Sequence, residues 1–166
     1  MPCGRSRVGL DVARGGTNPL RMPDAPSVVL DTNVIVAAGF QPDGASARLL
    51  AAIREGALRM VWDDATRRET EHIVHKIPPL SRMRIDDLYR PEDRYAGATD
   101  PAAFAFVPDP DDRKFLALAA ASGAALITLD EHLLGVRAQT DVRIVTPQEF
   151  RDLPPARPAP GPPQSG

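Results

Sequence analysis

The chain has 166 residues, a length that suits a single domain with its own hydrophobic core. Apolar residues make up 43% and charged residues 25%, which is typical of a globular protein, and the net charge of −2 does not mark a nucleic-acid-binding surface. Cys3 is the only cysteine, which excludes a disulfide framework and a thiolate metal cluster. No apolar run approaches the roughly 20 residues of a membrane helix, and Met1–Gly16 lacks the apolar stretch of a signal peptide, so we expect a cytoplasmic location.

The two ends of the chain differ in composition from the middle. Residues 1–26 mix Gly, Arg, Pro and Asn without apolar periodicity, and the segment at the other end is rich in proline. We therefore expect a folded unit over residues 27–152 and a disordered Pro-rich tail over residues 153–166. The N-terminal segment is expected to be disordered or a mis-assigned extension, with Met22 as an alternative start.

Between these ends, short apolar runs alternate with amphipathic segments whose apolar residues recur at helical spacing. In chain order, the predicted elements are a strand at 27–30, a helix at 45–54, a strand at 58–62, a helix from Asp63 or Asp64 to about His75, a helix at 81–89, a loop at 91–101, a helix from 109 to about 123, a strand at 125–128, a short helix at 131–134, a strand at 142–145 and a final short helix from 146. This alternation is typical of an α/β fold, in which helices cover both faces of a parallel sheet.

Local signals define several helix ends. Asp109 followed by Pro110 combines a capping side chain with a proline at the first helical position, and Gly123 is a suitable helix end. Thr146-Pro-Gln-Glu149 has the pattern of a capping box, in which the first and last side chains bond to each other's backbone N–H.

Acidic residues directly follow two of the predicted strands. Asp31 comes after Val-Val-Leu, and Asp130 comes after Leu-Ile-Thr-Leu. Asp112 lies in the first turn of the helix that precedes the second of these strands. Because parallel strands present their carboxyl ends at one edge of a sheet, where ligands bind in such folds, we expect the three acids to converge.

A fourth acid is expected on the helix that ends near His75, where two glutamates compete. Glu69 shares a face with Ala65 and Ile73, and we expect this face to turn toward the core. Glu71 lies on a face that we expect to be more solvated. We favour Glu69, and Glu71 is the alternative if the helix register differs.

Four converging carboxylates require neutralisation by protons or cations. Two like charges about 4 Å apart repel by roughly 4 kcal/mol at an effective dielectric constant near 20. Oxygen ligands without cysteine favour the hard cations Mg²⁺ or Mn²⁺. Such ions polarise a phosphate and activate water, so phosphodiester hydrolysis is the chemistry we expect.

Each acid also has an ordinary structural interpretation. Asp31 could cap a helix, and Asp130 could cap the helix that follows it. Asp112 is typical of the first turn of a helix, and Glu69 is typical of a solvated helix face. The metal site is therefore predicted from the set of four acids and not from any single one.

Four motifs occur in order over about residues 28–150. They are Val28-Val-Leu-Asp31-Thr-Asn33-Val34, Asp109-Pro-Asp-Asp112 with the helix to Ala119, Ile127-Thr-Leu-Asp130 with Leu133-Leu134, and Val145-Thr-Pro-Gln-Glu-Phe150. Together they resemble the PIN domain family, which includes the toxins of bacterial toxin–antitoxin pairs. This resemblance implies a three-layer α/β/α sandwich with a central parallel sheet and a divalent-metal endoribonuclease site.

The resemblance also implies roles for individual residues. Asp31 and Asp112 match the principal metal-binding acids of the family, Asp130 the acid that completes the metal site, and Glu69 the helical glutamate. Asn33 and Thr128 match polar positions that hold the acids or a water molecule in place.

Three positions need a separate interpretation. Asp109 also matches an acid that is common in the family, and we interpret it as a structural helix cap. Leu129 stands where the family often has glycine, a difference that would crowd the approach to Asp130. Arg113 stands where asparagine is common, and we consider it a contact to RNA phosphate.

The resemblance implies cleavage of single-stranded RNA by a water molecule that Mg²⁺ or Mn²⁺ activates. An antitoxin protein is the implied partner, and homodimers are common in the family. The cationic side chains considered as RNA backbone contacts are Arg48, Arg67, Arg68, Arg113 and Lys114.

Other functions remain as alternatives. One is an RNA-binding module with the same fold and no catalysis. Another is a metal-dependent phosphatase with Asp31 as its nucleophile, which is disfavoured because Asp31-Thr-Asn33 lacks a second aspartate.

Two other kinds of binding site are disfavoured by the sequence. No Gly-x-Gly-x-x-Gly follows the first strand, which disfavours a dinucleotide-binding domain. His72 and His75 lie three residues apart, but no further ligand completes a zinc motif.

Overall fold

The computed structural model describes residues 25–152. Four strands form one parallel sheet in the order β2-β1-β3-β4, and their bounds are β1 Ser27–Leu30, β2 Arg59–Met60, β3 Ala125–Ile127 and β4 Ile144–Val145. Leu30 pairs with Ile127 at the carboxyl ends of the two central strands. The predicted N-terminal extension, apart from residues 25 and 26, and the predicted Pro-rich tail lie outside the described residues.

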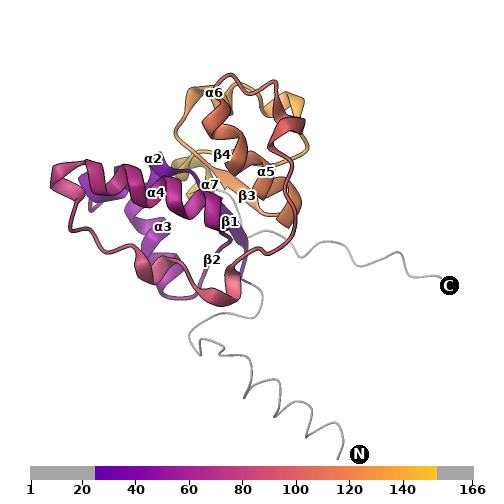
Figure 1. Cartoon of the computed structure of the whole chain (residues 1–166). Coiled ribbons are helices and arrows are strands. Elements are labelled where there is room, and N and C mark those ends of the chain that lie inside the picture. Colours follow the sequence, from indigo (N-terminus) through magenta and orange to yellow (C-terminus); the bar gives the residue numbers. More distant parts are fainter. Residues whose placement is uncertain (1–24, 153–166) are drawn as a thin grey trace, which may run out of the picture.

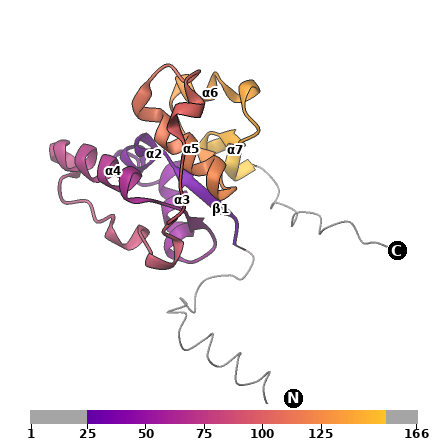
Figure 2. The same cartoon turned by 45° about the vertical axis from the view of Figure 1, so that its right-hand side comes forward.

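Helices cover both faces of this sheet. They are α2 Thr32–Phe40, α3 Ala45–Arg54, α4 Asp64–Lys76, α5 Arg113–Ser122, α6 Glu131–Leu134 and α7 Pro147–Asp152. Figures 1 and 2 show α2, α3 and α4 gathered on one side of the sheet, and α5 and α6 on the other. Within the described residues, no helix is long and apolar enough to span a bilayer.

Side-chain alternation along the strands creates two separate cores. Val28 and Leu30 of β1 point into one cluster, which contains apolar residues of α2, α3 and α4. Val29 points the opposite way, into a cluster with residues of α5 and α6. Successive side chains of a strand face opposite sides of a sheet, so a sheet buried on both faces separates two apolar layers. The predicted three-layer α/β/α sandwich is confirmed.

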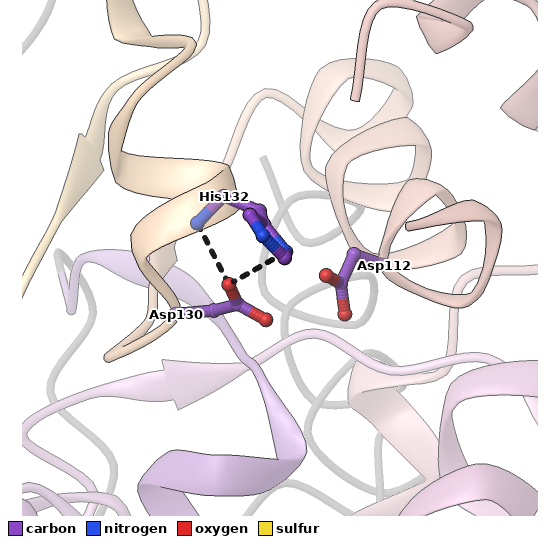
Figure 3. Close-up of side chains that lie close together, drawn as sticks. All are labelled: Asp112, Asp130 and His132. Atoms are coloured by element: carbon purple, nitrogen blue, oxygen red, sulfur yellow. Dashed lines mark hydrogen bonds and ion pairs between the residues drawn. The ribbon is translucent and has the colours of Figure 1, made fainter. Parts of the chain in front are cut away.

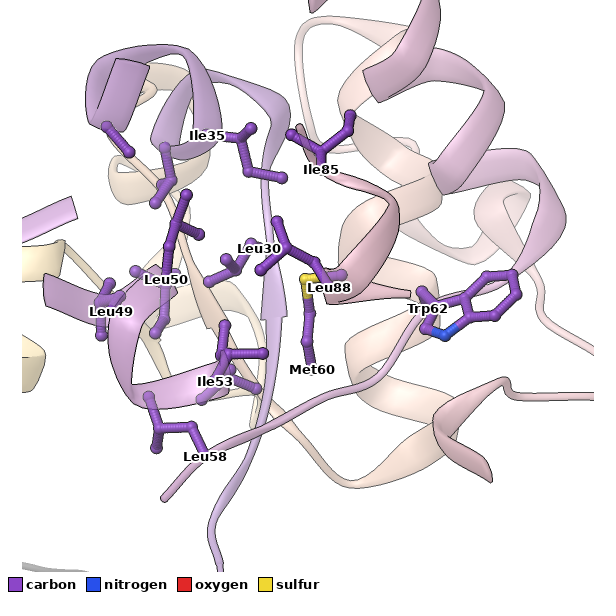
Figure 4. Packing of buried hydrophobic residues seen from close by; sticks show 14 of the residues in the cluster. Leu30, Ile35, Leu49, Leu50, Ile53, Leu58, Met60, Trp62, Ile85 and Leu88 are labelled. Carbon is purple, nitrogen blue, oxygen red and sulfur yellow. The ribbon is translucent and has the colours of Figure 1, made fainter. Parts of the chain in front are cut away.

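The first core depends on helical spacing in α3. Leu49, Leu50 and Ile53 are all buried, and Figure 4 shows them packed beside Leu30 and Met60 of the sheet. Each buried aliphatic side chain contributes roughly 1.5–3 kcal/mol to stability relative to an exposed one. The bounds of α3 agree with the helix predicted at 45–54.

Several predicted helix ends are confirmed where a cap defines them, but the residues after the Asp109 cap form a 3₁₀ turn at Pro110–Asp112 and α5 starts only at Arg113. Asp63 accepts a hydrogen bond from the Thr66 backbone N–H at 2.9 Å and starts α4. Thr146 and Glu149 form the reciprocal capping box at the start of α7, with bonds of 2.9 and 3.0 Å. Gly123 ends α5 in the left-handed conformation, with φ of 76°, which glycine adopts without steric cost.

The helix predicted at 81–89 is wrong. This segment holds only a 3₁₀ turn at Asp86–Leu88 after an earlier one at Pro78–Leu80. Arg54 explains the difference, because its guanidinium donates hydrogen bonds to the Arg84 carbonyl at 2.8 Å and to the Asp87 carboxylate at 2.9 Å. The segment is therefore held by α3 instead of by its own helical hydrogen bonds.

The helix α2 was not among the predicted elements. Its sequence, Thr32–Phe40, is apolar on most sides and contains the consecutive β-branched residues Val34, Ile35 and Val36. Such residues have weak helix propensity, so local signals do not indicate a helix here. Val34 and Ile35 are buried in the first core, and tertiary packing decides the conformation.

Candidate metal centre

Three of the predicted acids lie at the same edge of the sheet. Asp31 follows β1, Asp130 lies three residues beyond β3, and Asp112 immediately precedes α5. The backbone N–H of Asp31 donates to the Ile127 carbonyl at 3.0 Å, which extends the pairing of the two central strands to the acid itself. Residues almost one hundred positions apart therefore meet because their strands are neighbours.

Thr128 connects two of these acids. Its buried hydroxyl donates a hydrogen bond to Asp31 Oδ2 at 2.7 Å and accepts one from the Asp130 backbone N–H at 2.9 Å. Asn33 supports the same loop, because its Oδ1 accepts the Leu129 backbone N–H at 3.2 Å. The Leu129 side chain, considered a possible obstruction, is 42% exposed.

Asp31 is a buried acid with an altered pKa. Its relative exposure is 4%, and burial raises its pKa to about 6, although the hydrogen bond from Thr128 opposes the shift. The charges of Asp130 and Glu69 add to the increase. Asp31 occupies the N-cap position of α2 but makes no side-chain capping bond, so capping does not explain this residue.

Asp112 is the most unfavourably placed acid of the group. It is 9% exposed, and its Oδ2 is buried without a hydrogen-bond partner among the described residues. Burial raises its pKa to about 8, and the neighbouring carboxyl of Asp130 and the charge of Asp31 act in the same direction. An ordinary first-turn helix acid is solvated, so that interpretation does not account for Asp112.

Asp130 has a structural role as well as its place in the acidic group. Its Oδ1 accepts the His132 backbone N–H at 2.8 Å and thereby caps α6. The simple capping interpretation of this residue is correct in geometry. The carboxylate still has a second oxygen, and its charge acts on both Asp31 and Asp112.

His132 was not predicted to belong to the site. Asp112, Asp130 and His132 each offer one potential metal-ligand atom, and these atoms lie within 4.8 Å of one another. Figure 3 shows the three side chains pointing toward a common space. The sequence signal was the position of His132 two residues after Asp130, within the first turn of a helix.

The structure distinguishes the two glutamates of α4, but not for the expected reason. Glu69 acts electrostatically on Asp31 and its Oε2 lies 3.4 Å from Lys114 Nζ, whereas Glu71 accepts a 2.7 Å hydrogen bond from Arg67. The core-facing side of α4 carries Thr66, Thr70 and Val74. The expectation that the face of Ala65 and Ile73 turns inward was wrong, because the helix is rotated by about one residue.

The candidate cations differ in availability. Arg67 is engaged by Glu71 and lies over the rings of Trp62 and Tyr89. Arg113 donates to the carbonyls of Val107 and Ala105 at 2.9–3.1 Å. The guanidinium of Arg113 therefore holds the loop before α5, and its contact to RNA phosphate stays a prediction.

A shallow hollow adjoins Glu69. It is lined by Ala65, Arg68, Glu69, His72 and Lys114. Arg68 and Lys114 are thus the predicted cations that the structure places beside an acid of the group. Arg48 is exposed on α3, and His75 is exposed on α4.

The donor set fits a divalent cation. Asp112 Oδ2 is a buried acceptor without a donor among the described residues. The charges of Asp31 and Asp130 raise the pKa of Asp112, and that of Asp130 also raises the pKa of Asp31. A positive ion would relieve both costs, because it supplies a partner for the oxygen and favours the ionised carboxylates. Asp112 and Asp130 belong to a group of potential ligand atoms within 4.8 Å of one another, whereas Asp31 lies outside that group and acts on Asp112 through its charge. These three carboxylates would hold the ion.

We predict that Thr128→Val raises the pKa of Asp31 above about 6, because the lost hydroxyl is the hydrogen-bond donor that opposes the effect of burial. Valine has nearly the same shape, so packing should be kept. The measurement is an NMR titration of the Asp31 side-chain carboxyl carbon in the metal-free protein. An unchanged or lower pKa would show that the hydroxyl does not stabilise the carboxylate.

Comparison with known proteins gives one match. A family model described as PIN domain matches residues 27–132, which is well over half of the chain. Neither the search of curated proteins nor the search of solved structures gave a match. The matched region contains β1 to β3 and the four acids Asp31, Glu69, Asp112 and Asp130. The chain therefore belongs to the PIN domain family, a fold typical of metal-dependent nucleases.

Proposed function

We propose that this protein is a divalent-metal-dependent endoribonuclease that cleaves single-stranded RNA. The observation that carries the proposal is the buried, unpartnered Oδ2 of Asp112 beside the charges of Asp31 and Asp130. A protein gains no stability from such an arrangement, since each additional buried carboxylate disfavours ionisation of the others. An acidic group of this kind is explained by a cation that it binds during function.

The residues of this site would have two roles, binding the metal ion and positioning its ligands. Asp31, Asp112 and Asp130 would hold Mg²⁺ or Mn²⁺, and a bound ion would supply positive charge that polarises a phosphate and lowers the pKa of water. Thr128 fixes the orientation of the Asp31 carboxylate, and the hydrogen bond that it accepts from the Asp130 backbone N–H couples the two positions. Ligands held in this way lose little freedom when the ion binds.

Glu69 and the cations beside it would act on the water molecule and on the RNA substrate. Glu69 lies near enough to Asp31 to raise its pKa, so it can accept a proton or orient a water molecule near the acids. Lys114 and Arg68 line the same hollow and would contact the RNA backbone. Cleavage by water should leave a 5′-phosphate and a 3′-hydroxyl.

The decisive experiment incubates the purified protein with end-labelled single-stranded RNA in Mg²⁺, Mn²⁺ or EDTA, beside the Asp31→Asn variant. Glu71→Gln is the matched control, because this glutamate pairs with Arg67 and not with the acids. We expect metal-dependent internal cleavage by the wild type and the control and its loss in Asp31→Asn. Equal cleavage by wild type and Asp31→Asn would overturn the proposal.

The same assay separates the alternatives. RNA binding without cleavage, measured by fluorescence anisotropy, would indicate a catalytically inert PIN-fold module. Release of phosphate from small esters without cleavage of RNA would indicate a phosphatase.

We further propose that the protein is the toxin of a toxin–antitoxin pair, on the basis of its family. An antitoxin protein would then cover the acidic site, and a second copy of the chain would form a homodimer. Expression in a bacterial host should arrest growth, and Asp31→Asn should relieve the arrest. Light scattering on the purified chain tests the homodimer.

A further inference from the structure

We propose that His132 is a nitrogen ligand of the metal site and that it makes the site prefer a transition-series ion such as Mn²⁺ to Mg²⁺. This inference rests on the proposed function for the presence of a divalent ion at the acids. It goes beyond that function in the ligand set and in the identity of the metal.

The spacing of the side chains is that of ligands to one ion. His132 Nδ1 lies 3.6 Å from Asp130 Oδ1, which is too far for a good hydrogen bond. Two ligands of one octahedral ion with bonds of about 2.1 Å are separated by roughly 3.0 Å when adjacent and roughly 4.2 Å when opposite. The separation of His132 from Asp130 falls between these values, and the three potential ligand atoms lie within 4.8 Å of one another, slightly beyond the wider value.

Asp112 provides independent evidence that an ion binds between these side chains. Its side chain is more than nine-tenths buried, its Oδ2 has no hydrogen-bond partner among the described residues, and it points toward the space that His132 and Asp130 border (Figure 3). A buried acceptor of this kind is destabilising unless it is satisfied. An ion between the three side chains would satisfy it.

The local backbone holds His132 at the acidic group. The His132 backbone N–H donates a hydrogen bond to Asp130 Oδ1 at 2.8 Å, and this bond caps α6. The same bond keeps the imidazole of His132 beside the Asp130 carboxylate. The His132 side chain is 60% exposed, so core packing does not dictate its position. The exposed ring is therefore free to adjust its position when an ion binds.

An imidazole nitrogen changes which ion the site binds best. Mg²⁺ strongly prefers oxygen ligands, whereas first-row transition ions bind imidazole well, and Mn²⁺ shares with Mg²⁺ an affinity for carboxylates. A set of carboxylates with one histidine thus favours Mn²⁺ and its neighbours over Mg²⁺. A purely carboxylate site would not make this distinction.

The test uses the full chain, stripped of metal with a chelator and loaded with Mn²⁺. Pulsed electron paramagnetic resonance detects ¹⁴N coupling to Mn²⁺ only when a nitrogen is bound to the ion. We expect this coupling in the wild type, its loss in His132→Asn, and its retention in His75→Asn. His75 is a suitable control because it is exposed on α4. The His132→Asn variant keeps the backbone N–H that caps α6.

Calorimetric titration gives the second readout. His132→Asn should weaken Mn²⁺ binding at least about tenfold, the scale on which metal sites respond to changes in their supporting groups. Mg²⁺ binding should change much less, and His132→Asp should reduce the preference for Mn²⁺. Thermal unfolding of each variant shows that the fold is kept.

Each remaining outcome has a definite meaning. Mn²⁺ binding without ¹⁴N coupling in the wild type, or coupling that persists in His132→Asn, would overturn the role of His132 and leave the proposed function standing. Absence of both Mn²⁺ and Mg²⁺ binding by the wild type would overturn this inference together with the proposed metal site.

Discussion

Asp112→Asn is expected to abolish metal-dependent RNA cleavage and, at the same time, to stabilise the metal-free protein near pH 8. Asparagine keeps the shape of the side chain but not its charge, so the ion loses a ligand whose Oδ2 has no other partner among the described residues. Charge stabilisation by a bound ion is worth several kcal/mol, so a loss of about 10³-fold in rate is expected.

The stabilising half of this prediction follows from the pKa values of two buried acids. Burial raises the pKa of Asp31 to about 6 and that of Asp112 to about 8, whereas both are near 3.8 in an unfolded chain. Between pH 4 and pH 8 the folded protein therefore binds more protons than the unfolded one, and its stability falls as the pH rises. Asp112→Asn removes the part of this loss that occurs at the alkaline end.

Urea unfolding at pH 5, 6.5 and 8 measures this effect. In the presence of EDTA, the wild type should lose stability over the series and Asp112→Asn should lose less. Saturating Mn²⁺ should restore stability to the wild type at pH 8 but not to the variant. Asp111→Asn is the matched control, because Asp111 is an exposed acid in the 3₁₀ turn Pro110–Asp112, directly before Asp112. A variant less stable than the wild type at pH 8 would contradict the prediction.

Leu116→Ala is expected to destabilise the fold by about 2–5 kcal/mol, the usual cost of such a cavity in a packed core. Leu116 is fully buried in the second apolar cluster, where α5 packs on the sheet. The total stability of a domain is only about 5–15 kcal/mol, so this change should lower the midpoint of urea unfolding markedly.

Leu129→Ala provides the comparison for this experiment. Leu129 is 42% exposed, and its truncation should change stability by no more than about 0.5 kcal/mol. A loss below about 1 kcal/mol for Leu116→Ala would mean that α5 does not pack on the sheet as described.

Much of the fold was predictable because its signals are local. The strand at residues 27–30 and the helix at 45–54 follow from side-chain periodicity, and the ends of α4 and α7 follow from caps at Asp63 and Thr146. The convergence of Asp31, Asp112 and Asp130 was also predictable, because the parallel strands before Asp31 and Asp130 end at one edge and the helix that begins near Asp112 leads into the second of these strands. The helix at 81–89 was predicted wrongly, since hydrogen bonds from Arg54 compete with those of a helix.

By itself, the sequence determined where each strand and cap lies, and with them the edge at which the acids gather. Only the tertiary structure decided which side chains outside the strand ends lie beside the acids and which are bound elsewhere. The rotation of α4 placed Glu69 by the acids, Arg113 was bound by nearby carbonyls, and the turn after Asp130 brought His132 to the site. The physical reason is range: periodicity and capping act within a few residues, whereas these contacts depend on the packing of separate elements.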